Sequence, residues 1–581
     1  MAPSCYLCRE YNCNLSMNTN QTIPDYIFES SWEVCNKVGG IYAVLSTRAN
    51  TLQKKFKDRI IFIGPDCWQE KTCPYFKEDL SLFQDWRNEA EKEGLKIRTG
   101  RWTIPGNPIA ILVDFNKYYK DKNTIYTQLW EDFKVDSLHA YGDYDEASMF
   151  SYAAAKVVES FYNKYLGKKD KVIYHGNEWM TGLGLLYIKK HLPQIATIFT
   201  THATSIGRSI AGNNKPLYDY LFAYNGDQMA EELNVQSKHS IEKQTAHNVD
   251  CFTTVSEITG KECEELLDKP ADVILPNGFE DDFIPKGAFF TKKRAAARKK
   301  ALQVANALLG TQLDDDTLIV STSGRYEFRN KGVDVYIEAL NRLLRDNGMK
   351  KTVLAFIEVP GWCGEPRQDL IERLESGKKY DTPLDVPMIT HWLHNMSHDN
   401  VLGMLKYLDM QNRNEDKVKL IFLPCYLDGN DGILNIPYYD IILGNDLCIY
   451  PSYYEPWGYT PLEAIAFKVP CITTDLAGFG LWANAVKGRY CEIEDGVKVV
   501  HRTDYNYSEV ADRIKETIIK FSNFTPAEVK RARSNAYNLS KKALWKEFIE
   551  NYYIAYDFAL NKAEQRKNNL NSINRLEPNI N

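Results

Sequence analysis

Short β-branched segments recur along the chain from Tyr26 onward, each followed by a loop rich in Gly, Asn or Pro and then by helical periodicity. This alternation is typical of βαβ units and predicts parallel sheets covered by helices. In the first half the predicted strands are Tyr26–Phe28, Arg59–Ile63, Lys171–Tyr174, Ala196–Thr200, Cys251–Val255 and Val273–Leu275. In the second half they are Leu318–Thr322, Val353–Ile357, Val418–Leu423, Leu447–Tyr450 and Cys471–Thr473. The pattern therefore predicts two Rossmann-like lobes.

The length of 581 residues accommodates two large lobes with additions. The expected organisation is a disordered leader (1–22), a first lobe (23–285), a second lobe (286–510) with inserted helices (361–417), C-terminal helices that pack back on the first lobe (511–565) and a polar tail (566–581). Asp281 to Lys300 changes character and ends in a basic run, so we expect a hinge or linker there. A break is expected at Phe524–Pro526 within the C-terminal helices.

The amino-acid composition limits which kinds of molecule the protein is expected to bind and in which compartment it is expected to occur. Lys and Arg number 71 and Asp and Glu 77, a net charge of −6, so no overall positive charge favours a nucleic acid or an anionic membrane. The 13 cysteines are odd in number and irregularly spaced, which indicates a reducing compartment rather than a disulfide framework. No segment resembles a signal peptide or a membrane span, and we expect a soluble cytoplasmic protein.

The first candidate site is the segment Asn36–Ile41, which follows the opening strand and precedes a predicted helix. Its Lys37, Gly39 and Gly40 place a positive charge and accessible backbone N–H groups at a helix N-terminus, which favours a phosphate or a sugar. A tight strand-to-helix turn explains the same residues about equally well.

The second candidate site is Gly324–Gly332, directly after the strand Leu318–Thr322. Ligands of open α/β sheets bind at the carboxyl ends of the strands, so Arg325 and Lys331 are placed to neutralise a diphosphate without a metal. The alternative is a solvated basic loop.

The third candidate site is Pro451–Glu463, which follows the strand Leu447–Tyr450. Thr460, with Glu463 three residues later, fits the capping-box pattern and predicts a helix N-terminus aimed at the sheet edge. Glu463 is then explained as a cap, whereas Glu455 has no such role.

Glu455 and Glu463 also form the E-x7-E pair of retaining glycosyltransferases with the two-lobed GT-B fold. The surrounding YYEPWGYTPLE resembles the eukaryotic-type, UDP-glucose-dependent glycogen synthases. The resemblance extends through FESSWEVCNKVGGIYAVL, IATIFTTHATSIGR, CFTTVSEIT, PNGF, GRYEFRNKG and TTDLAGFG. It implies an α/β GT-B enzyme that transfers glucose from UDP-glucose to the non-reducing 4-hydroxyl of an α-1,4-glucan, with retention of configuration.

The resemblance implies roles for particular residues. Arg325 and Lys331 hold the donor diphosphate, Glu455 faces the transferred glucose, His202 approaches the sugar and Arg208 the phosphates. The remaining donor-side residues that it implies are Lys37, Gly39, Gly40, Tyr438 (stacked on uracil), Trp457, Gly458, Tyr459, Thr460 and Glu463 (at the ribose hydroxyls). Asn177 and Glu178 belong to the acceptor side, although Asn177 stands where a histidine is usual.

The resemblance implies no metal or other cofactor, because two arginines, a lysine and a helix N-terminus take the place of Mg²⁺ at the leaving group. It implies UDP-glucose, glycogen or another α-1,4-glucan, and a priming protein as partners. It also implies a homo-oligomer, usually a tetramer built on the inserted helices, although the insertion 361–417 is short.

Several alternatives stay open. They are an ADP-glucose-using starch-type synthase, a catalytically idle polysaccharide-binding scaffold, and a phosphorylase with pyridoxal phosphate. Glu528 and Val529 fall where the family's arginine cluster binds glucose 6-phosphate, so we expect weak or absent activation. The cysteine group Cys5, Cys8 and Cys13 lacks a fourth zinc ligand, and the helically spaced His391, His394 and His398 favour a structural cluster over a metal site.

Overall fold

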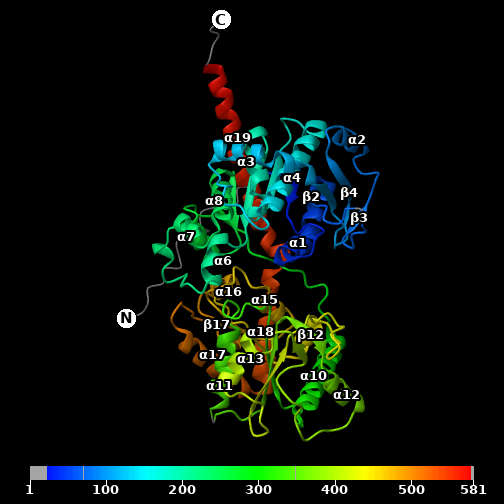
Figure 1. Cartoon of the computed structure of the whole chain (residues 1–581), viewed down its shortest axis with the longest axis vertical. Coiled ribbons are helices and arrows are strands. Elements are labelled where there is room, and N and C mark those ends of the chain that lie inside the picture. Colours follow the sequence, from blue (N-terminus) through cyan, green and yellow to red (C-terminus); the bar gives the residue numbers. More distant parts are fainter. Residues whose placement is uncertain (1–21, 70, 347, 577–581) are drawn as a thin grey trace.

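Two sheets, one in each half of the chain, organise the fold (Figure 1). The computed structural model describes residues 22–69, 71–346 and 348–576, with backbone alone for 569–576. The Cys5, Cys8 and Cys13 prediction, and nearly all of the predicted leader, lie outside these residues. The predicted α/β fold with parallel sheets is confirmed.

In the first lobe the strands run in the order β3-β4-β5-β2-β1-β6-β7-β8-β9. They are β1 (Tyr26–Ser30), β2 (Ile60–Pro65), β3 (Phe76–Glu78), β4 (Lys96–Trp102), β5 (Ile109–Asp114), β6 (Val172–Asn177), β7 (Ala196–Thr201), β8 (Cys251–Thr254) and β9 (Val273–Ile274). The helices are α1 (Gly40–Phe56), α2 (Gln84–Lys92), α3 (Lys122–Phe133), α4 (Tyr144–Tyr165), α5 (Gly182–His191), α6 (Ser205–Gly212), α7 (Gly226–Glu232), α8 (Gln236–Asn248) and α9 (Glu257–Leu266). All six predicted strands are confirmed, while β3, β4 and β5 were not predicted.

In the second lobe the order is β14-β11-β10-β15-β16-β17. Its strands are β10 (Leu318–Ser323), β11 (Val353–Glu358), β14 (Val418–Leu423), β15 (Leu447–Ile449), β16 (Cys471–Thr474) and β17 (Val497–Val500). The helices are α10 (Gly287–Leu309), α11 (Val333–Leu344), α12 (Gln368–Ser376), α13 (Asn400–Tyr407), α14 (Tyr438–Gly444), α15 (Tyr459–Ala466) and α16 (Gly478–Lys487). Apolar clusters pack α11 and α13 on one face of this sheet and α10, α12 and α14 on the other.

The predicted linker Asp281–Lys300 is largely helix, because α10 begins at Gly287 and its Lys, Arg and Ala residues are strong helix formers. The insertion 361–417 contains α12 and α13 but also a two-stranded antiparallel ribbon, β12 (Cys363–Pro366) with β13 (His391–Leu393). His391 therefore lies in a strand, and the predicted helical spacing of His391, His394 and His398 is wrong. Pairing of His391 with Pro366 overrides the local pattern.

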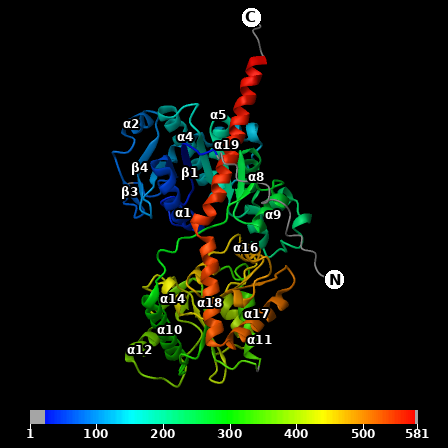
Figure 2. The ribbon, with the colours of Figure 1, turned by 180° about the vertical axis from the view of Figure 1, so that it is seen from behind.

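Three helices end the described chain: α17 (Tyr507–Ser522), α18 (Pro526–Ser540) and α19 (Trp545–Leu576). The expected break at Phe524–Pro526 is confirmed. α17 and α18 pack on α11 and α15 of the second lobe, so the prediction that all of 511–565 packs on the first lobe is wrong for them. Only α19 returns to the first lobe, against β6, β7 and α1, and it continues as helix through much of the predicted polar tail (Figure 2).

A buried ion pair fixes α19 to the first lobe. Arg48 of α1 pairs with Glu29 of β1, and both are fully buried. The Arg48 guanidinium also lies 4.2 Å from the centre of the Tyr552 ring in α19. The Trp545 Nε1–H donates to Thr47 Oγ1 at 2.8 Å, so the helix is anchored by polar contacts as well as by its apolar side.

The chain crosses between the lobes twice, and the two crossings are joined. The N–H of Phe279, in the segment leading to α10, donates to Ala543 O at 3.2 Å, and the N–H of Trp545 donates to Phe279 O at 3.1 Å. These bonds form a short parallel bridge between Phe279 and Leu544. None of the described helices combines the length and the apolar character that crossing a membrane requires.

Candidate active site

The carboxyl ends of the parallel strands of both sheets face the region between the lobes, and hydrogen bonds join the lobes there. The Tyr454 hydroxyl of the second lobe donates to Glu262 of α9 at 3.1 Å, and the N–H of Leu217 donates to the Tyr453 hydroxyl at 2.9 Å. Gly478, at the start of α16, packs so closely on Ser256 that a Cβ there would lie 2.5 Å from the serine Cβ. This cleft therefore takes residues from both lobes.

Lys331 and Glu455 form an ion pair in the cleft, with side chains 14% and 16% exposed. Their loops follow β10 and β15, which are neighbours in the sheet. Gly332 has φ of +70° and lies against Pro451 O, a position that only glycine fits. Arg325 is more open, at 65% exposed, and lies 3.1 Å from Glu327. In the second predicted site each cation is thus paired with a carboxylate, Arg325 with Glu327 and Lys331 with Glu455.

The start of α15 differs from the predicted capping box. Gly458 is the N-cap, with φ of +113°, so Thr460 already lies in the first helical turn and caps nothing with its side chain. The Glu463 carboxylate instead accepts from the Tyr439 hydroxyl at 3.0 Å, and burial raises the pKa of Glu463 to about 7. The helix starts earlier than predicted because a left-handed glycine lets the chain turn there.

The other second-lobe candidates differ in accessibility. The side chain of Trp457 is buried against Trp482 and Phe548, so the predicted role at the donor does not fit its ring. The Tyr459 hydroxyl donates to Gly278 O at 3.2 Å. Tyr438 begins α14, is half-buried, and shares a 2.7 Å hydrogen bond with Ser323 at the end of β10. Tyr438 therefore lies at the carboxyl edge of the sheet.

The first predicted site, at the start of α1, already has an anionic partner. Lys37, Gly39 and Gly40 are exposed there, as predicted for ligand contact. The Glu33 carboxylate, however, accepts from the N–H groups of Gly39 and Tyr42 at 2.9 and 2.7 Å. A donor phosphate could use these N–H groups only by displacing Glu33.

His202, Asn177 and Glu178 form one hydrogen-bonded group in the first lobe. The His202 N–H donates to the Glu178 carboxylate at 2.9 Å, and His202 Nε2 lies 3.0 Å from Asn177 Oδ1. Burial and the charge of Arg48 lower the pKa of His202 to about 3, whereas burial and nearby Glu242 raise that of Glu178 to about 8. His202 is therefore neutral throughout the physiological range.

Arg208, in α6, is exposed and lies close enough to Glu178 and to Tyr454 of the second lobe to interact with both electrostatically. Arg325 of the second lobe is likewise close enough to Glu33 of the first lobe to interact with it electrostatically. The structure thus brings the predicted cations and His202 to the two walls of one cleft, but leaves Glu463 engaged with Tyr439.

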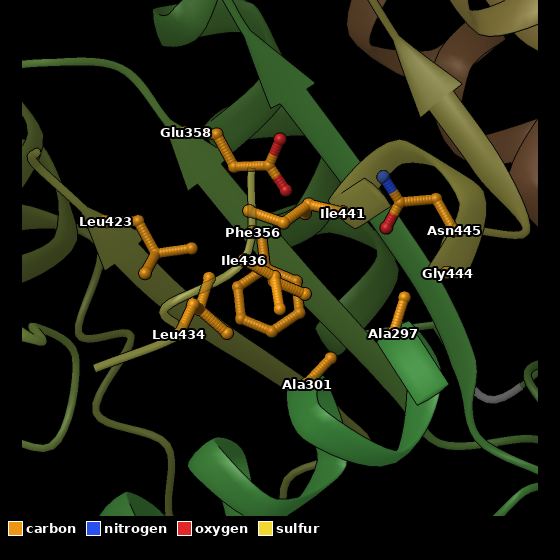
Figure 3. Close-up of a pocket in the computed structure, with 10 residues that line it drawn as sticks. All are labelled: Ala297, Ala301, Phe356, Glu358, Leu423, Leu434, Ile436, Ile441, Gly444 and Asn445. Atoms are coloured by element: carbon orange, nitrogen blue, oxygen red, sulfur yellow. The ribbon is translucent and has the colours of Figure 1, made fainter. Parts of the chain in front are cut away.

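Glu358, at the end of β11, was not singled out in the sequence. It lines a small pocket with Ala297, Phe356 and Ile441, is 4% exposed, and neither carboxylate oxygen has a hydrogen-bond partner (Figure 3). Burial raises its pKa to about 8. Its sequence context, a strand end one residue before Val359, offers no signal that a carboxyl group is buried there.

Replacing Glu358 by methionine should stabilise the protein in a pH-dependent way. The folded state holds the proton more tightly than the unfolded one, so the stability of the unaltered protein falls as pH rises from about 4.5 to about 8. The gain in Glu358→Met should be absent near pH 4.5 and about 4 kcal/mol at pH 8. Urea unfolding at several pH values measures it. Exposed Glu375, replaced likewise, serves as the control for the substitution itself.

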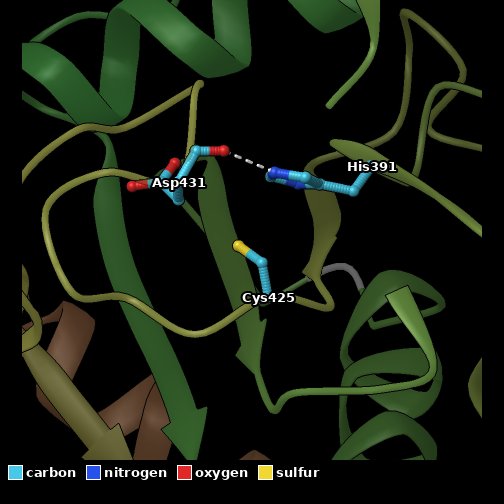
Figure 4. Close-up of side chains that lie close together, drawn as sticks. All are labelled: His391, Cys425 and Asp431. Atoms are coloured by element: carbon cyan, nitrogen blue, oxygen red, sulfur yellow. Dashed lines mark hydrogen bonds between the residues drawn. The ribbon is translucent and has the colours of Figure 1, made fainter. Parts of the chain in front are cut away.

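Among the described residues, one group of side chains brings possible metal ligands together: His391, Cys425 and Asp431, with ligand atoms within 4.8 Å of one another (Figure 4). His391 Nε2 faces the backbone O of Asp431 at 2.7 Å and Nδ1 faces Thr390 Oγ1 at 2.9 Å. The Asp431 carboxylate accepts from the N–H of Leu434 at 2.7 Å. The ligand atoms of His391 and Asp431 are already engaged, so the group fits a structural cluster better than a metal centre.

A sequence model described as glycogen synthase matches residues 29–365 and 370–577. The chain belongs to the glycogen synthase family. A glycogen [starch] synthase of Neurospora crassa is 30% identical over 605 residues, which cover 92% of this chain and 84% of the relative. Isoform 2 of Saccharomyces cerevisiae is also 30% identical, over 611 residues that cover 92% and 86%. Membership of the glycogen synthase family makes this protein a glycosyltransferase.

Among solved structures, the catalytic domain of starch synthase IV from Arabidopsis thaliana, bound to ADP and acarbose, is similar with a TM-score of 0.54. The alignment covers 92% of this chain and 99% of that one at 15% identity. This likeness confirms the predicted GT-B fold that glycogen synthases share with other glycosyltransferases.

Proposed function

We propose that this chain transfers glucose from UDP-glucose to the non-reducing 4-hydroxyl of an α-1,4-glucan such as glycogen, with retention of configuration and release of UDP. The observation that carries the proposal is the Lys331–Glu455 ion pair beside Arg325, at neighbouring strand ends and opposite His202 and Arg208. A diphosphate and a sugar both find partners in such a cleft.

The proposed chemistry needs positive charge at the leaving group. As the anomeric C–O bond lengthens, charge develops on the β-phosphate, and Arg325, Lys331, Arg208 and the N-terminus of α15 are the groups that would stabilise it. We propose that these groups act without a metal ion. Glu455, already paired with Lys331, would face the developing positive charge on the sugar.

Retention is proposed to proceed by front-face attack. The acceptor 4-hydroxyl would approach on the side from which UDP departs and lose its proton to the departing phosphate, so no covalent glycosyl intermediate forms. Contacts such as Tyr454–Glu262 close the lobes and would exclude water from the cleft. Mass-spectrometric detection of glucose bound to Glu455 would overturn this route.

Donor and acceptor are tested by incubating the protein with glycogen and either UDP-glucose or ADP-glucose, and measuring nucleotide release and glucose incorporation. We expect incorporation from UDP-glucose, lost in Arg325→Ala. A preference for ADP-glucose would favour a starch-type synthase. Binding of glycogen without transfer from either donor would favour a scaffold.

Glucose 6-phosphate should change the rate by no more than about twofold. The α18 segment that would hold it has Glu528 in a capping box with Thr525, and Arg533 contacts Asn445 O at 3.1 Å beside Asp446. These groups leave no cluster of free guanidinium groups for a phosphate ester on the described part of α18. Activation above fivefold at millimolar glucose 6-phosphate would contradict this expectation.

We propose further that the protein is cytoplasmic, extends glucans begun by a priming protein and works as a homo-oligomer. Buried thiols such as Cys251 and Cys471 suit a reducing compartment. Light scattering of the eluted protein measures its mass in solution, and a monomer would contradict the oligomer.

A further inference from the structure

A chain of polar contacts runs from the cleft to the helix that joins the lobes. His202 Nε2 lies 3.0 Å from Asn177 Oδ1, and Asn177 Nδ2 lies 3.0 Å from Glu29 Oε1. Glu29 pairs with Arg48, whose guanidinium lies over the Tyr552 ring of α19. Asn177, Glu29 and Arg48 are each at most 2% exposed, so water does not compete for these contacts.

The direction of each hydrogen bond follows from the first ion pair. Burial alone raises the pKa of Glu29, but Arg48, with His175 and Asn177, lowers it below the ordinary value, so the carboxylate is ionised. An ionised carboxylate only accepts, which makes Asn177 Nδ2 the donor to Glu29. Nδ2 also lies 3.3 Å from the backbone O of Ser30, a second acceptor. The amide of Asn177 therefore has one orientation.

That orientation decides where the proton of His202 resides. Asn177 turns its carbonyl Oδ1, which can only accept, toward His202 Nε2, so Nε2 must carry the hydrogen. A neutral imidazole has one N–H, and its Nδ1 is then an acceptor. Among the described residues, none makes a hydrogen bond to Nδ1 of His202. This atom is also not among the fully buried polar atoms that lack a partner, so it keeps some exposure.

We propose that Asn177 is a positioning residue that holds His202 as the Nε2–H tautomer, so that Nδ1 accepts a hydroxyl hydrogen of the donor sugar. The role of Nδ1 rests on the proposed function, whereas the tautomer does not. The charged and titratable groups that act on His202 are Arg48 of α1, His175 of β6, Glu29 of β1 and Arg208 of α6, with Glu178 at its backbone N–H. Burial opposes protonation most, and Arg48, His175 and Arg208 add to its effect, so the ring stays neutral.

Two substitutions separate positioning from packing. Asn177→Leu keeps the number and branching of the side-chain heavy atoms but can neither donate to Glu29 nor accept from His202. Asn177→His keeps the polarity, because a neutral imidazole donates with one nitrogen and accepts with the other. In the leucine variant His202 should no longer be restricted to the Nε2–H tautomer, whereas in the histidine variant it should keep that tautomer.

The first measurement is two-bond ¹H–¹⁵N correlation NMR on the full-length protein with ¹⁵N-labelled histidine, in which His202→Gln identifies the His202 signals. We expect a protonated Nε2 and an unprotonated Nδ1 in the unaltered protein and in Asn177→His. In Asn177→Leu the Nδ1–H tautomer should become populated. A protonated Nδ1 in the unaltered protein, or an unchanged tautomer in Asn177→Leu, would overturn the proposal.

The second measurement is steady-state transfer from UDP-glucose to glycogen. Asn177→Leu should lower kcat roughly 10- to 100-fold with little change in the KM for glycogen, and Asn177→His should recover kcat to within about threefold. Equal loss in both variants would indicate packing alone and overturn the positioning role. The expected NMR signals without any glucose transfer would retain Asn177 as the positioning residue and reject the proposed function.

Discussion

Replacing Lys331 by alanine should lower kcat for glucose transfer by about 10³-fold. The substitution removes a cation that would stabilise the leaving diphosphate, and it leaves Glu455 without its partner in a largely buried cleft. An unpaired carboxylate beside a diphosphate adds repulsion to the lost attraction. Incorporation of labelled glucose from saturating UDP-glucose measures the effect.

Lys351 provides the matched control. It lies in the same lobe and pairs with Asp316 at 2.7 Å, but both side chains are exposed. Lys351→Ala should retain kcat to within twofold. If Lys331→Ala kept more than a tenth of the original kcat while remaining folded, the assignment of Lys331 to the leaving group would be wrong.

Replacing Arg48 by methionine should destabilise the protein by about 3–5 kcal/mol, because it leaves the buried Glu29 carboxylate without its cation. Urea unfolding followed by tryptophan fluorescence measures the change. The substitution also removes the guanidinium that contacts Tyr552 of α19. We expect the substitution to weaken both the packing of α19 on the first lobe and the packing within that lobe.

A second substitution distinguishes the charge from the packing. Arg48→Met combined with Glu29→Gln removes both charges and should recover part of the lost stability. The pair Arg101–Asp58, 2.6 Å apart with side chains 28% and 55% exposed, serves as the control, and Arg101→Met should cost less than about 1 kcal/mol. Equal losses in Arg48→Met and in the double variant would show that burial of Glu29 is not the cause.

Most strands that the sequence predicted are buried on both faces, although β5 (IAILVD) is buried too and was missed. β1 and β10 read as β-branched or aromatic runs between loops, a pattern that sheet burial imposes. β4 (KIRTGRW) mixes charged and apolar residues because it lies near the antiparallel edge of the sheet, where one side meets solvent. Its place depends on pairing with β5, which local sequence does not reveal.

Local sequence also does not fix the residue at which a helix starts. Thr460-Pro461-Leu462-Glu463 and Thr525-Pro526-Ala527-Glu528 share one capping pattern. The second forms the capping box of α18, whereas in the first the helix begins at Tyr459 and Tyr439 takes the Glu463 carboxylate. Gly458, in a left-handed conformation, lets the first helix begin at Tyr459, and the distant Tyr439 takes the Glu463 carboxylate, so the shared pattern alone does not decide the outcome.

The candidate site also contains residues that the sequence predicted and residues that it did not. Strand order brings Lys331 and Glu455 together, and the motifs around them predicted a shared site. The partner of the α1 N-terminus, Glu33, and the unpaired Glu358 were missed. Each depends on where a single side chain turns after the backbone is placed, which neither periodicity nor spacing encodes.

The bridge between Phe279 and Leu544 limits how the two lobes can move relative to each other. Two crossings that are hydrogen-bonded to each other act as one pin, because neither can lengthen or slide without breaking the bonds to the other. Separation of the lobes along a line would break these bonds, whereas rotation about them need not, so we expect the cleft to open as a wedge whose gap widens with distance from the bridge. We therefore expect the substrates of the proposed reaction to enter and leave on the side remote from Phe279, where a small rotation gives the widest opening.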